Sequence, residues 1–216
     1  ARLQNSQGFW ETGPESLWLR EAYGAGPGFY DTRFNTELAD IFVTVYESQG
    51  GTFLRAALER YAAFYGGFAQ NHHQETESGG WLVEDYWSPD THTAIHTSLD
   101  HQLAECLVLY RMADALERED LAQLADRLLL AVEDTGMRWV NDAGDLHYSR
   151  SAEGVYDGTD YPFLTYNDLL ALNGYLRART GEDNETLTAL MAAKRAWMDR
   201  NGVTGYDREP EEEELP

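Results

Sequence analysis

The sequence has one cysteine, one lysine and no long apolar run, and each scarcity limits what the protein can be. Cys106 has no second cysteine with which to form a disulfide, and its place on an apolar helix face predicts a core residue. No apolar run approaches the roughly 20 residues that a membrane-spanning helix needs. We therefore expect no membrane span and a chain that folds around a buried core.

Positive charge is also scarce, because 16 Lys and Arg stand against 38 Asp and Glu and the formal net charge is −22. Lys194 is the only lysine, so the other basic residues are arginines. No basic stripe is present to replace the counterions of phosphates, which excludes nucleic acid as a partner. Carboxylates at this density repel each other unless salt screens them. The composition predicts a soluble protein, cytoplasmic or secreted, from a high-salt environment, and an ordinary acidic surface is the alternative.

Three regions of the chain differ in composition. Residues 1–34 are rich in Gly, Pro and aromatic residues and predict an irregular arm with a short helix near Pro14–Ala22. Residues 35–205 have the apolar periodicity of helices and predict an α/α domain of helical hairpins. Residues 206–216 include a run of four glutamates and predict a disordered acidic tail.

The periodicity within residues 35–205 divides into three helix pairs. The first helix has an apolar face formed by Leu38, Ile41, Phe42 and Val45. Gly50-Gly51 ends this helix, and the partner helix is expected to end near Gly66-Gly67 or a few residues later. The second pair begins with a helix predicted over 94–117. In the third pair, Gly181 is expected to cap the end of the first helix.

The three pairs are similar to one another, since Leu38, Leu103 and Leu169 lie near the start of each pair, 65 and 66 residues apart. Such a period predicts an all-α arc of about three antiparallel helical hairpins, a partial α/α toroid, with the loops 73–93 and 141–162 at one end. The alternative is an unrelated helical bundle. An arc of three pairs leaves a ring of six open, which indicates a fragment, a missing N-terminal domain or a homo-oligomer.

The two long loops hold the residues best suited to chemistry. Aromatic faces bind sugar rings, and arginine and histidine hold carboxylates. Tyrosine and glutamate exchange protons when burial changes their pKa values. The candidates are Trp81, Glu84, Asp85, Tyr86, His92, His147, Tyr148, Arg150, Asp160 and Tyr161. For each aromatic residue the alternative is an ordinary core or rim position.

Histidine pairs in the chain raise the question of a metal site. His92 and His96 are spaced i, i+4, but no third ligand follows at a recognisable spacing, so we expect no metal and no cofactor. Asp100 and His101 are interpreted as residues that interact with the dipole of a helix start. No phosphate-binding loop and no nucleophile elbow is present.

Three segments resemble a known family. Trp81-Leu82-Val83-Glu84-Asp85-Tyr86, before a helix ending in Leu107-Val108-Leu109-Tyr110, resembles the C-terminal helical domain of glucuronyl 5-epimerases, which have Trp-Tyr-Glu-Glu-Tyr-Pro before a helix ending in Gly-Leu-Tyr-Asp. Residues 141–148 resemble the family's aspartate–glycine turn leading to Ile-Tyr-Asp-Leu-Arg. Residues 160–169 resemble its Asp-Tyr-His-Thr-Thr-His-Ile-Asn-Gln-Leu, without the two histidines. His96-Thr97 stands where the family has Asn-Gly, and the family's β-rich N-terminal domain has no counterpart in these 216 residues.

The resemblance implies proton abstraction at carbon 5 of a uronic acid within a polysaccharide or oligosaccharide. It implies Glu84 and Tyr86 as catalytic groups on one side of the sugar, and Tyr148 and Tyr161 on the other. The substrate-binding residues that follow are Trp81, His92, His147 and Arg150. Among these, His147 and Arg150 are the candidates for neutralising the carboxylate as the carbanion forms.

Three alternatives stay open at this point. A lyase shares the first step and then expels the oxygen at carbon 4. An α/α-toroid glycoside hydrolase uses two carboxylates, here Glu84 with Asp145 or Asp160. A non-catalytic helical module that binds glycan or a partner domain is favoured by the departures from the family pattern.

Overall fold

The computed structural model describes residues 4–206, so most of the expected acidic tail lies outside the described residues. The α-helices are α1 (Leu17–Tyr23), α2 (Thr32–Gln49), α3 (Thr52–Asn71), α4 (Leu99–Leu116), α5 (Glu119–Thr135), α6 (Leu164–Thr180) and α7 (Glu185–Asn201), with a 3-10 helix, η1, over Gly136–Trp139. The strands are β1 (Tyr30–Asp31), β2 (His73–Glu75), β3 (Trp81–Val83), β4 (Tyr86–Trp87), β5 (Thr97–Ser98), β6 (His147–Arg150) and β7 (Tyr156–Thr159). Within this part of the chain, no helix is long and apolar enough to cross a membrane.

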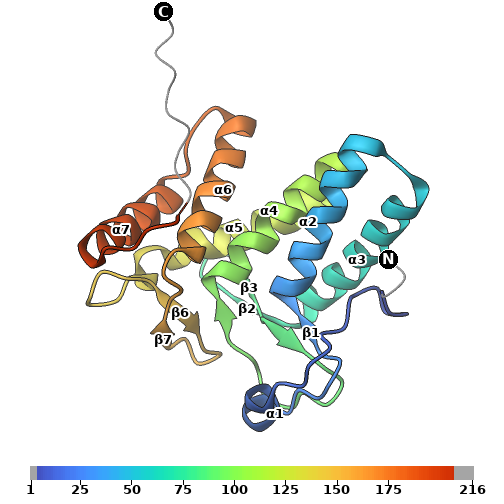
Figure 1. Cartoon of the computed structure of the whole chain (residues 1–216), viewed down its shortest axis with the longest axis horizontal. Helices are drawn as coiled ribbons and strands as arrows, with labels where there is room; N and C mark the ends of the chain where they lie inside the picture. Colours follow the sequence, from blue (N-terminus) through green and yellow to red (C-terminus); the bar gives the residue numbers. More distant parts are fainter. Residues whose placement is uncertain (1–3, 207–216) are drawn as a thin grey trace, which may run out of the picture.

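Helices α2 to α7 form three hairpins that stand side by side (Figure 1). The central helix α4 packs against α2 on one side and α6 on the other, so these three form an inner row. Helices α3, α5 and α7 form an outer row behind them. The predicted all-α arc of three hairpins, a partial α/α toroid, is confirmed.

The main apolar core lies between the two rows of helices. Leu103 and Leu169 of the sequence repeat are fully buried, and Leu38 is half-buried. Cys106 is fully buried, as predicted. Each fully buried leucine contributes about 1.5–3 kcal/mol relative to an exposed one, so stacking the hairpins stabilises the arc.

The helix ends follow the expected signals. Gly181 has φ +86° and its N–H donates to the carbonyl of Arg177, which confirms the predicted cap. Helix α3 ends at Asn71, a few residues after Gly66-Gly67, as predicted, and Phe68 and Ala69 beyond the glycines are buried.

One helix start differs from the prediction, because α4 begins at Leu99 and not near residue 94. Thr97 and Ser98 are instead extended and pair with Arg150 and Ser149 of β6. The carboxylate of Asp85 accepts the backbone N–H of Ser98 at 2.8 Å, which satisfies a donor that the helix would otherwise use. Tertiary contacts therefore set this helix start.

The long loops contain short strands, where the sequence predicts irregular chain. Strand β2 pairs with β3, β1 with β4, and β5, β6 and β7 form one three-stranded sheet. Arg150 in the loop 141–162 donates a hydrogen bond to Gln74 in the loop 73–93. The two loops therefore lie at the same end of the helices, as predicted (Figure 1).

The N-terminal arm packs over the same end. Helix α1 lies close to its predicted position, and α2 begins at Thr32, inside the range expected for the arm. Leu19, Ala25 and Phe29 form a second small core against Tyr23 and Tyr86. The arm is thereby fixed to the loop that carries Tyr86.

The apolar face predicted for α2 is buried in part, because Leu38 and Phe42 pack against the main core and Val45 is half-buried. Ala39 and Val43 are fully buried, whereas Ile41 is 55% exposed. The helix turns its small residues towards α4 and leaves Ile41 on the opposite side of the inner row, where no helix of the described chain covers it.

Candidate active site

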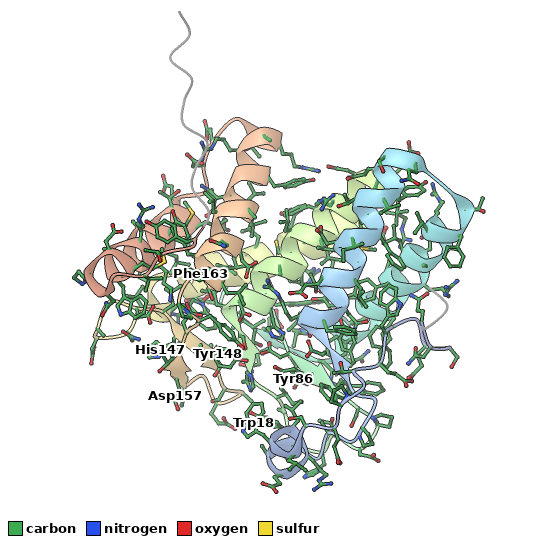
Figure 2. The ribbon with its side chains drawn as sticks, in the orientation of Figure 1. Trp18, Tyr86, His147, Tyr148, Asp157 and Phe163 are labelled. Carbon is green, nitrogen blue, oxygen red and sulfur yellow. The ribbon has the colours of Figure 1, made fainter. Side chains whose placement is uncertain are left out.

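Four tyrosines gather around one histidine at the loop end of the inner helices, and we call this group the tyrosine–histidine cluster. Its members are Tyr23, Tyr86, His96, Tyr148 and Tyr161. The ring centroid of His96 lies 5.8 Å from that of Tyr23, 5.9 Å from Tyr86 and 5.8 Å from Tyr148. Tyr161 lies 5.8 Å from Tyr148. Figure 2 shows Tyr86 and Tyr148 near Trp18, between α1 and the β6–β7 hairpin.

Strand pairing brings these residues together from distant parts of the chain. The pairing of Ser98 with Ser149 holds Tyr148 on β6 beside the segment that carries His96. The pairing of Asp31 with Tyr86 fixes β4 against the start of α2. Tyr23 arrives from α1, which the small core of the arm holds in place.

A chain of polar contacts runs from a buried carboxylate to a tyrosine hydroxyl. Asp85 is fully buried and also accepts the hydroxyl of Ser98. The Nε2 atom of His96 lies 3.2 Å from Asp85 Oδ2, and its Nδ1 atom lies 2.8 Å from the hydroxyl of Tyr23. When the ring carries its proton on Nε2, facing the carboxylate, Nδ1 accepts the hydrogen of Tyr23.

A second histidine keeps the carboxylate charged. His101 Nδ1 lies 3.8 Å from Asp85 Oδ1. Burial alone would raise the pKa of Asp85, but His101, His96 and the bond from Ser98 outweigh it, and the pKa falls below its ordinary value. Burial alone would lower the pKa of His101, but the nearby carboxylates outweigh it and raise that pKa. The pair is therefore held as carboxylate and imidazolium.

The tyrosines of the cluster hold their protons firmly. Burial is the largest cause of a raised pKa at Tyr23, Tyr86, Tyr148 and Tyr161. The contacts of Tyr148 with Ser98 and Tyr86 lower the pKa of its hydroxyl, but burial outweighs them. At neutral pH the tyrosine hydroxyls of the cluster are therefore protonated and can act as proton donors. His96 can accept a proton on Nδ1, which faces Tyr23.

Three buried polar atoms in or beside the cluster lack a hydrogen-bond partner among the described residues, Asp100 Oδ1, His101 Nδ1 and His96 Nε2. His96 Nε2 faces Asp85 at 3.2 Å without the geometry of a hydrogen bond. Asp100 is only 2% exposed, burial raises its pKa, and its charge acts on both Tyr148 and Tyr161. Buried polar groups are normally satisfied, so unpartnered atoms here are typical of a place where a ligand supplies the missing bonds.

The structure brings together three of the four expected catalytic residues, Tyr86, Tyr148 and Tyr161. Glu84 lies apart from them, with its carboxylate 3.2 Å from Nδ1 of His72. The chain bends at Asp85 between β3 and β4, and the carboxylate that reaches the cluster is that of Asp85.

Two of the expected substrate-binding residues also lie outside the cluster. Trp81 stacks on His73 at 4.2 Å, and the guanidinium of Arg127 lies 4.5 Å from its ring on the side of α5. His92 is exposed at the rim, where its Nδ1 lies 3.3 Å from the carbonyl of Asp90.

His147 and Arg150 meet a different tyrosine of the β6–β7 hairpin. The ring of His147 lies 6.0 Å from that of Tyr156, and the guanidinium carbon of Arg150 lies 5.7 Å from the same ring. Figure 2 shows His147 and Tyr148 as neighbours on this hairpin. Of the two, Tyr148 is the residue in ring contact with His96.

Asp145 and Asp160 are bound by the only lysine in the chain, and we call this group the Lys194 centre. Lys194 is fully buried, and its Nζ lies 2.6 Å from Asp145 Oδ1 and 2.6 Å from Asp160 Oδ2. It also donates to the carbonyl of Tyr161 at 2.8 Å. Both carboxylates are thereby engaged in holding the hairpin to α7.

Sequence reasoning missed Tyr23, His96, Asp100 and His101 as members of one site. In the sequence, His96 was noted as one of two histidines at a metal-binding spacing and as a departure from the family pattern. Asp100 and His101 were noted as residues near the start of a helix. Tyr23 gave no signal, since it lies 73 positions before the histidine that it contacts. Within residues 4–206, no group of three His, Cys, Asp or Glu is arranged to hold a metal ion.

Solved structures with the same arrangement of helices were found by comparison of folds. A GH76 α-mannanase from Bacteroides thetaiotaomicron matches with a TM-score of 0.58 and 12% identity, over 82% of this chain and 46% of that one. A sugar epimerase from a ruminal bacterium matches with 0.58 and 13%, over 92% and 50%. The unsaturated glucuronyl hydrolase of Bacillus sp. GL1 matches with 0.52 and 14%, over 91% and 51%.

These comparisons define the chain as an α/α-toroid-like helical fold. The chain spans about half the length of the solved structures that it matches. No family model matches the sequence, and no curated protein matches it. At such low identities the likeness shows the fold alone, so the narrower resemblance to glucuronyl 5-epimerases stays a prediction.

Proposed function

We propose that this protein is carbohydrate-active and abstracts a proton at carbon 5 of a uronic acid within a polysaccharide or oligosaccharide, as a 5-epimerase does. The observation that carries the proposal is the chain of contacts Asp85–His96–Tyr23 in one cluster with Tyr86 and Tyr148, each of which affects the pKa of the other. One system accepts a proton and the other donates one, which are the two events that inversion at a carbon requires.

On the accepting side, Tyr23 acts together with His96. Its oxygen takes the proton from the sugar while its own hydrogen passes to Nδ1 of His96, 2.8 Å away. The imidazolium that forms is stabilised by Asp85, which stays ionised because its pKa is lowered. A positioned base of this kind typically contributes roughly 10²–10⁴-fold to a rate.

On the donating side, Tyr148 returns a proton to the opposite face of the sugar. Its raised pKa keeps the hydroxyl protonated until the carbanion forms. Tyr86 and Tyr148 affect each other's pKa, and Tyr86 replaces the proton that Tyr148 gives up. One proton leaves the substrate and one enters, so the product is the epimer.

The negative charge beside carbon 5 needs a cation, and His101 is the candidate. Its ring lies 5.6 Å from that of Tyr86, and the surrounding carboxylates keep it protonated. A fixed positive charge in a buried site stabilises a developing carbanion more than it would in water. The names of two similar structures, a sugar epimerase and an unsaturated glucuronyl hydrolase, support a sugar substrate.

The test is deuterium incorporation at carbon 5 when the protein is incubated with polyuronates in heavy water. We expect exchange in the parent protein and a loss of roughly 10²–10⁴-fold in Tyr23→Phe. The matched control is Tyr175→Phe, whose hydroxyl donates to Asp114 on α4, away from the cluster. Absence of exchange with every polyuronate, or full exchange in Tyr23→Phe, would refute the proposal.

Hydrolysis of a glycosidic bond is the second candidate, and Asp100 favours it. A buried carboxyl with a raised pKa and a free oxygen has the properties of a general acid. The carboxylates expected for this role, Asp145 and Asp160, are held by Lys194. Release of reducing ends without exchange at carbon 5, abolished in Asp100→Asn, would favour hydrolysis over epimerisation.

A further inference from the structure

Four aromatic rings form a row across the tyrosine–histidine cluster, with consecutive ring centroids 5.8 Å apart. Trp18 on α1 lies at this distance from His96, and Tyr148 lies at the same distance from His96. Tyr161 follows 5.8 Å from Tyr148. The two middle rings, His96 and Tyr148, belong to the proton-transferring groups of the proposed function, so the row has one further aromatic residue at each end.

The two ends of the row are open to solvent, whereas its middle is shielded. Trp18 is 53% and Tyr161 is 47% exposed, although both have large rings. His96 is buried and Tyr148 is half-buried. Figure 2 shows Tyr148 between Trp18 and Phe163, which is the second residue after Tyr161. One exposed aromatic ring therefore lies on either side of the candidate site.

Both end residues are held in place by contacts with the folded chain. The ring of Trp18 lies 5.7 Å from that of Tyr23, and the next residue, Leu19, is buried in the small core of the arm. The carbonyl of Tyr161 accepts a hydrogen bond from Lys194 at 2.8 Å. Rings that are fixed before a ligand arrives lose little conformational freedom when it binds, which favours affinity.

An exposed aromatic ring beside a sugar site is suited to bind the neighbouring sugar. The C–H faces of a sugar ring are apolar, and they pack on the flat face of an aromatic side chain. Trp and Tyr are also the residues that most often anchor a bound partner. Neither Trp18 nor Tyr161 takes part in the proposed proton transfers, so both remain free for this role.

We propose that Trp18 and Tyr161 bind the two sugars that flank the reacting uronic acid, so that the protein recognises an internal residue in a chain of at least three sugars. The identity of the central sugar rests on the proposed function, whereas the two end positions rest on the ring contacts and the exposure. A uronic acid at a chain end fills only one end position, and a free monosaccharide fills neither. The site therefore selects for chain length as well as for the kind of sugar.

Calorimetric titration with a trisaccharide that has glucuronic acid at its centre, and with free glucuronic acid, tests the proposal without requiring turnover. The Kd of the trisaccharide should rise roughly tenfold in Trp18→Ala and in Tyr161→Ala, the scale of one aromatic contact. Free glucuronic acid reaches neither end, so its Kd should be the same in both variants as in the parent. The matched control is Leu17→Ala, since Leu17 is 59% exposed beside Trp18 but on another face of α1, and it should bind the trisaccharide like the parent.

Three results would overturn the proposal. They are a trisaccharide that binds the parent no more tightly than free glucuronic acid, a Kd that either variant leaves unchanged, and an equal loss of affinity for both ligands, which would mean that the substitution disturbs the cluster. Exchange at carbon 5 separates this proposal from the proposed function. Weaker trisaccharide binding in both variants, without any exchange in the parent, would refute the epimerase and leave the roles of Trp18 and Tyr161 in place. Exchange in the parent with unchanged binding in the variants would refute these roles alone.

Discussion

Two groups of buried carboxylates lie close to the β6–β7 hairpin, and they differ in what neutralises them. In the Lys194 centre, Asp145 and Asp160 share one buried ammonium group. In the tyrosine–histidine cluster, Asp85 faces two histidines and a serine hydroxyl. Nearby, Asp100 keeps one oxygen without a hydrogen-bond partner among the described residues.

This difference suggests that the Lys194 centre supports the fold, whereas the tyrosine–histidine cluster is the candidate site. In the Lys194 centre, short contacts to one ammonium group fix the geometry of the hairpin on α7, although burial raises the pKa of Asp160 to about 6. Histidine and tyrosine change protonation, so carboxylates placed beside them control where protons move. The two groups meet at Tyr161, whose carbonyl accepts from Lys194 while its ring packs on Tyr148. The scaffold thus positions one wall of the site.

Removing one hydroxyl from the cluster should have the largest effect. Tyr148→Phe keeps the ring, so we expect activity to fall roughly 10²–10⁴-fold if the hydroxyl transfers a proton. Stability should change by no more than about 1 kcal/mol, the scale of one hydrogen bond. The measurements are exchange at carbon 5 and a denaturant melt.

The control for this variant lies on the paired strand. The hydroxyl of Tyr156 is buried without a hydrogen-bond partner in the described structure, so Tyr156→Phe removes the same atom outside the cluster. It should retain full activity. Equal losses in both variants would mean that the hairpin tolerates no change, and Tyr148 would then have no special role.

Breaking the Lys194 centre should damage the fold. Lys194→Met leaves two buried carboxylates without their cation, and removing one partner of a buried pair typically costs about 3–5 kcal/mol. Thermal melting should show this as a fall of roughly 6–20 °C for a chain of this length. Arg195→Met is the control, since Arg195 is half-exposed and its partners are the exposed Asp199 along α7 and the rings of Tyr166 and Tyr206. A parent-like melt of Lys194→Met would refute the scaffold role.

A further buried carboxylate, that of Glu105, has only neutral hydrogen-bond partners and should make the free energy of unfolding depend on pH. Glu105 is fully buried and accepts hydrogen bonds from Thr36 and Tyr61. Burial raises its pKa to about 7, from an ordinary value of 4.5. Between these values the folded state holds a proton that the unfolded state has lost, so stability falls as pH rises from 4.5 to 7, by about 3 kcal/mol.

The comparison that isolates this carboxylate is Glu105→Gln. Glutamine keeps an oxygen for Thr36 and Tyr61 but does not titrate. Burial also raises the pKa values of Asp160 and Asp168 to about 6, and these groups remain in both proteins. Urea unfolding of both proteins at pH 5 and pH 7.5 should therefore show a smaller decline in the variant. Parallel declines would exclude Glu105 as the source.

Salt should have the smallest effect on the melting temperature, and it should act only on the charges at the surface. With a net charge of −22, screening should raise the melting temperature of the parent between low salt and about 1 M. The loss caused by Lys194→Met should stay the same at both salt concentrations, because a buried pair is hardly screened. A melting temperature that does not rise with salt would contradict the high-salt interpretation.

The sequence predicts the hairpins well because their signal is local. Apolar periodicity and glycine punctuation depend on neighbours within a helix, so the three pairs and the cap at Gly181 follow from them. The start of α4 depends on Asp85 and β6, which are distant in sequence, and the prediction there was wrong. The strands of the long loops were missed for the same reason.

The sequence predicted only the part of the candidate site that depends on the two long loops lying at the same end of the helices. Placing the loops 73–93 and 141–162 together was enough to gather Tyr86, Tyr148 and Tyr161. Choosing between Glu84 and Asp85 requires the direction of each side chain, which depends on how the chain bends between β3 and β4. The contribution of Tyr23 depends on how the N-terminal arm folds over the loop end of the helices, and no periodicity in the sequence predicts that arrangement.

The burial of Lys194 has a consequence for the reactivity of the molecule. Because it is the only lysine in the sequence and is fully buried, the folded chain exposes no side-chain primary amine. Acylating labels and amine cross-linkers therefore have no lysine to modify while the protein is folded. Modification of Lys194 becomes a direct report of opening, so the rate of acylation at this one residue measures how often α7 separates from the hairpin that it holds.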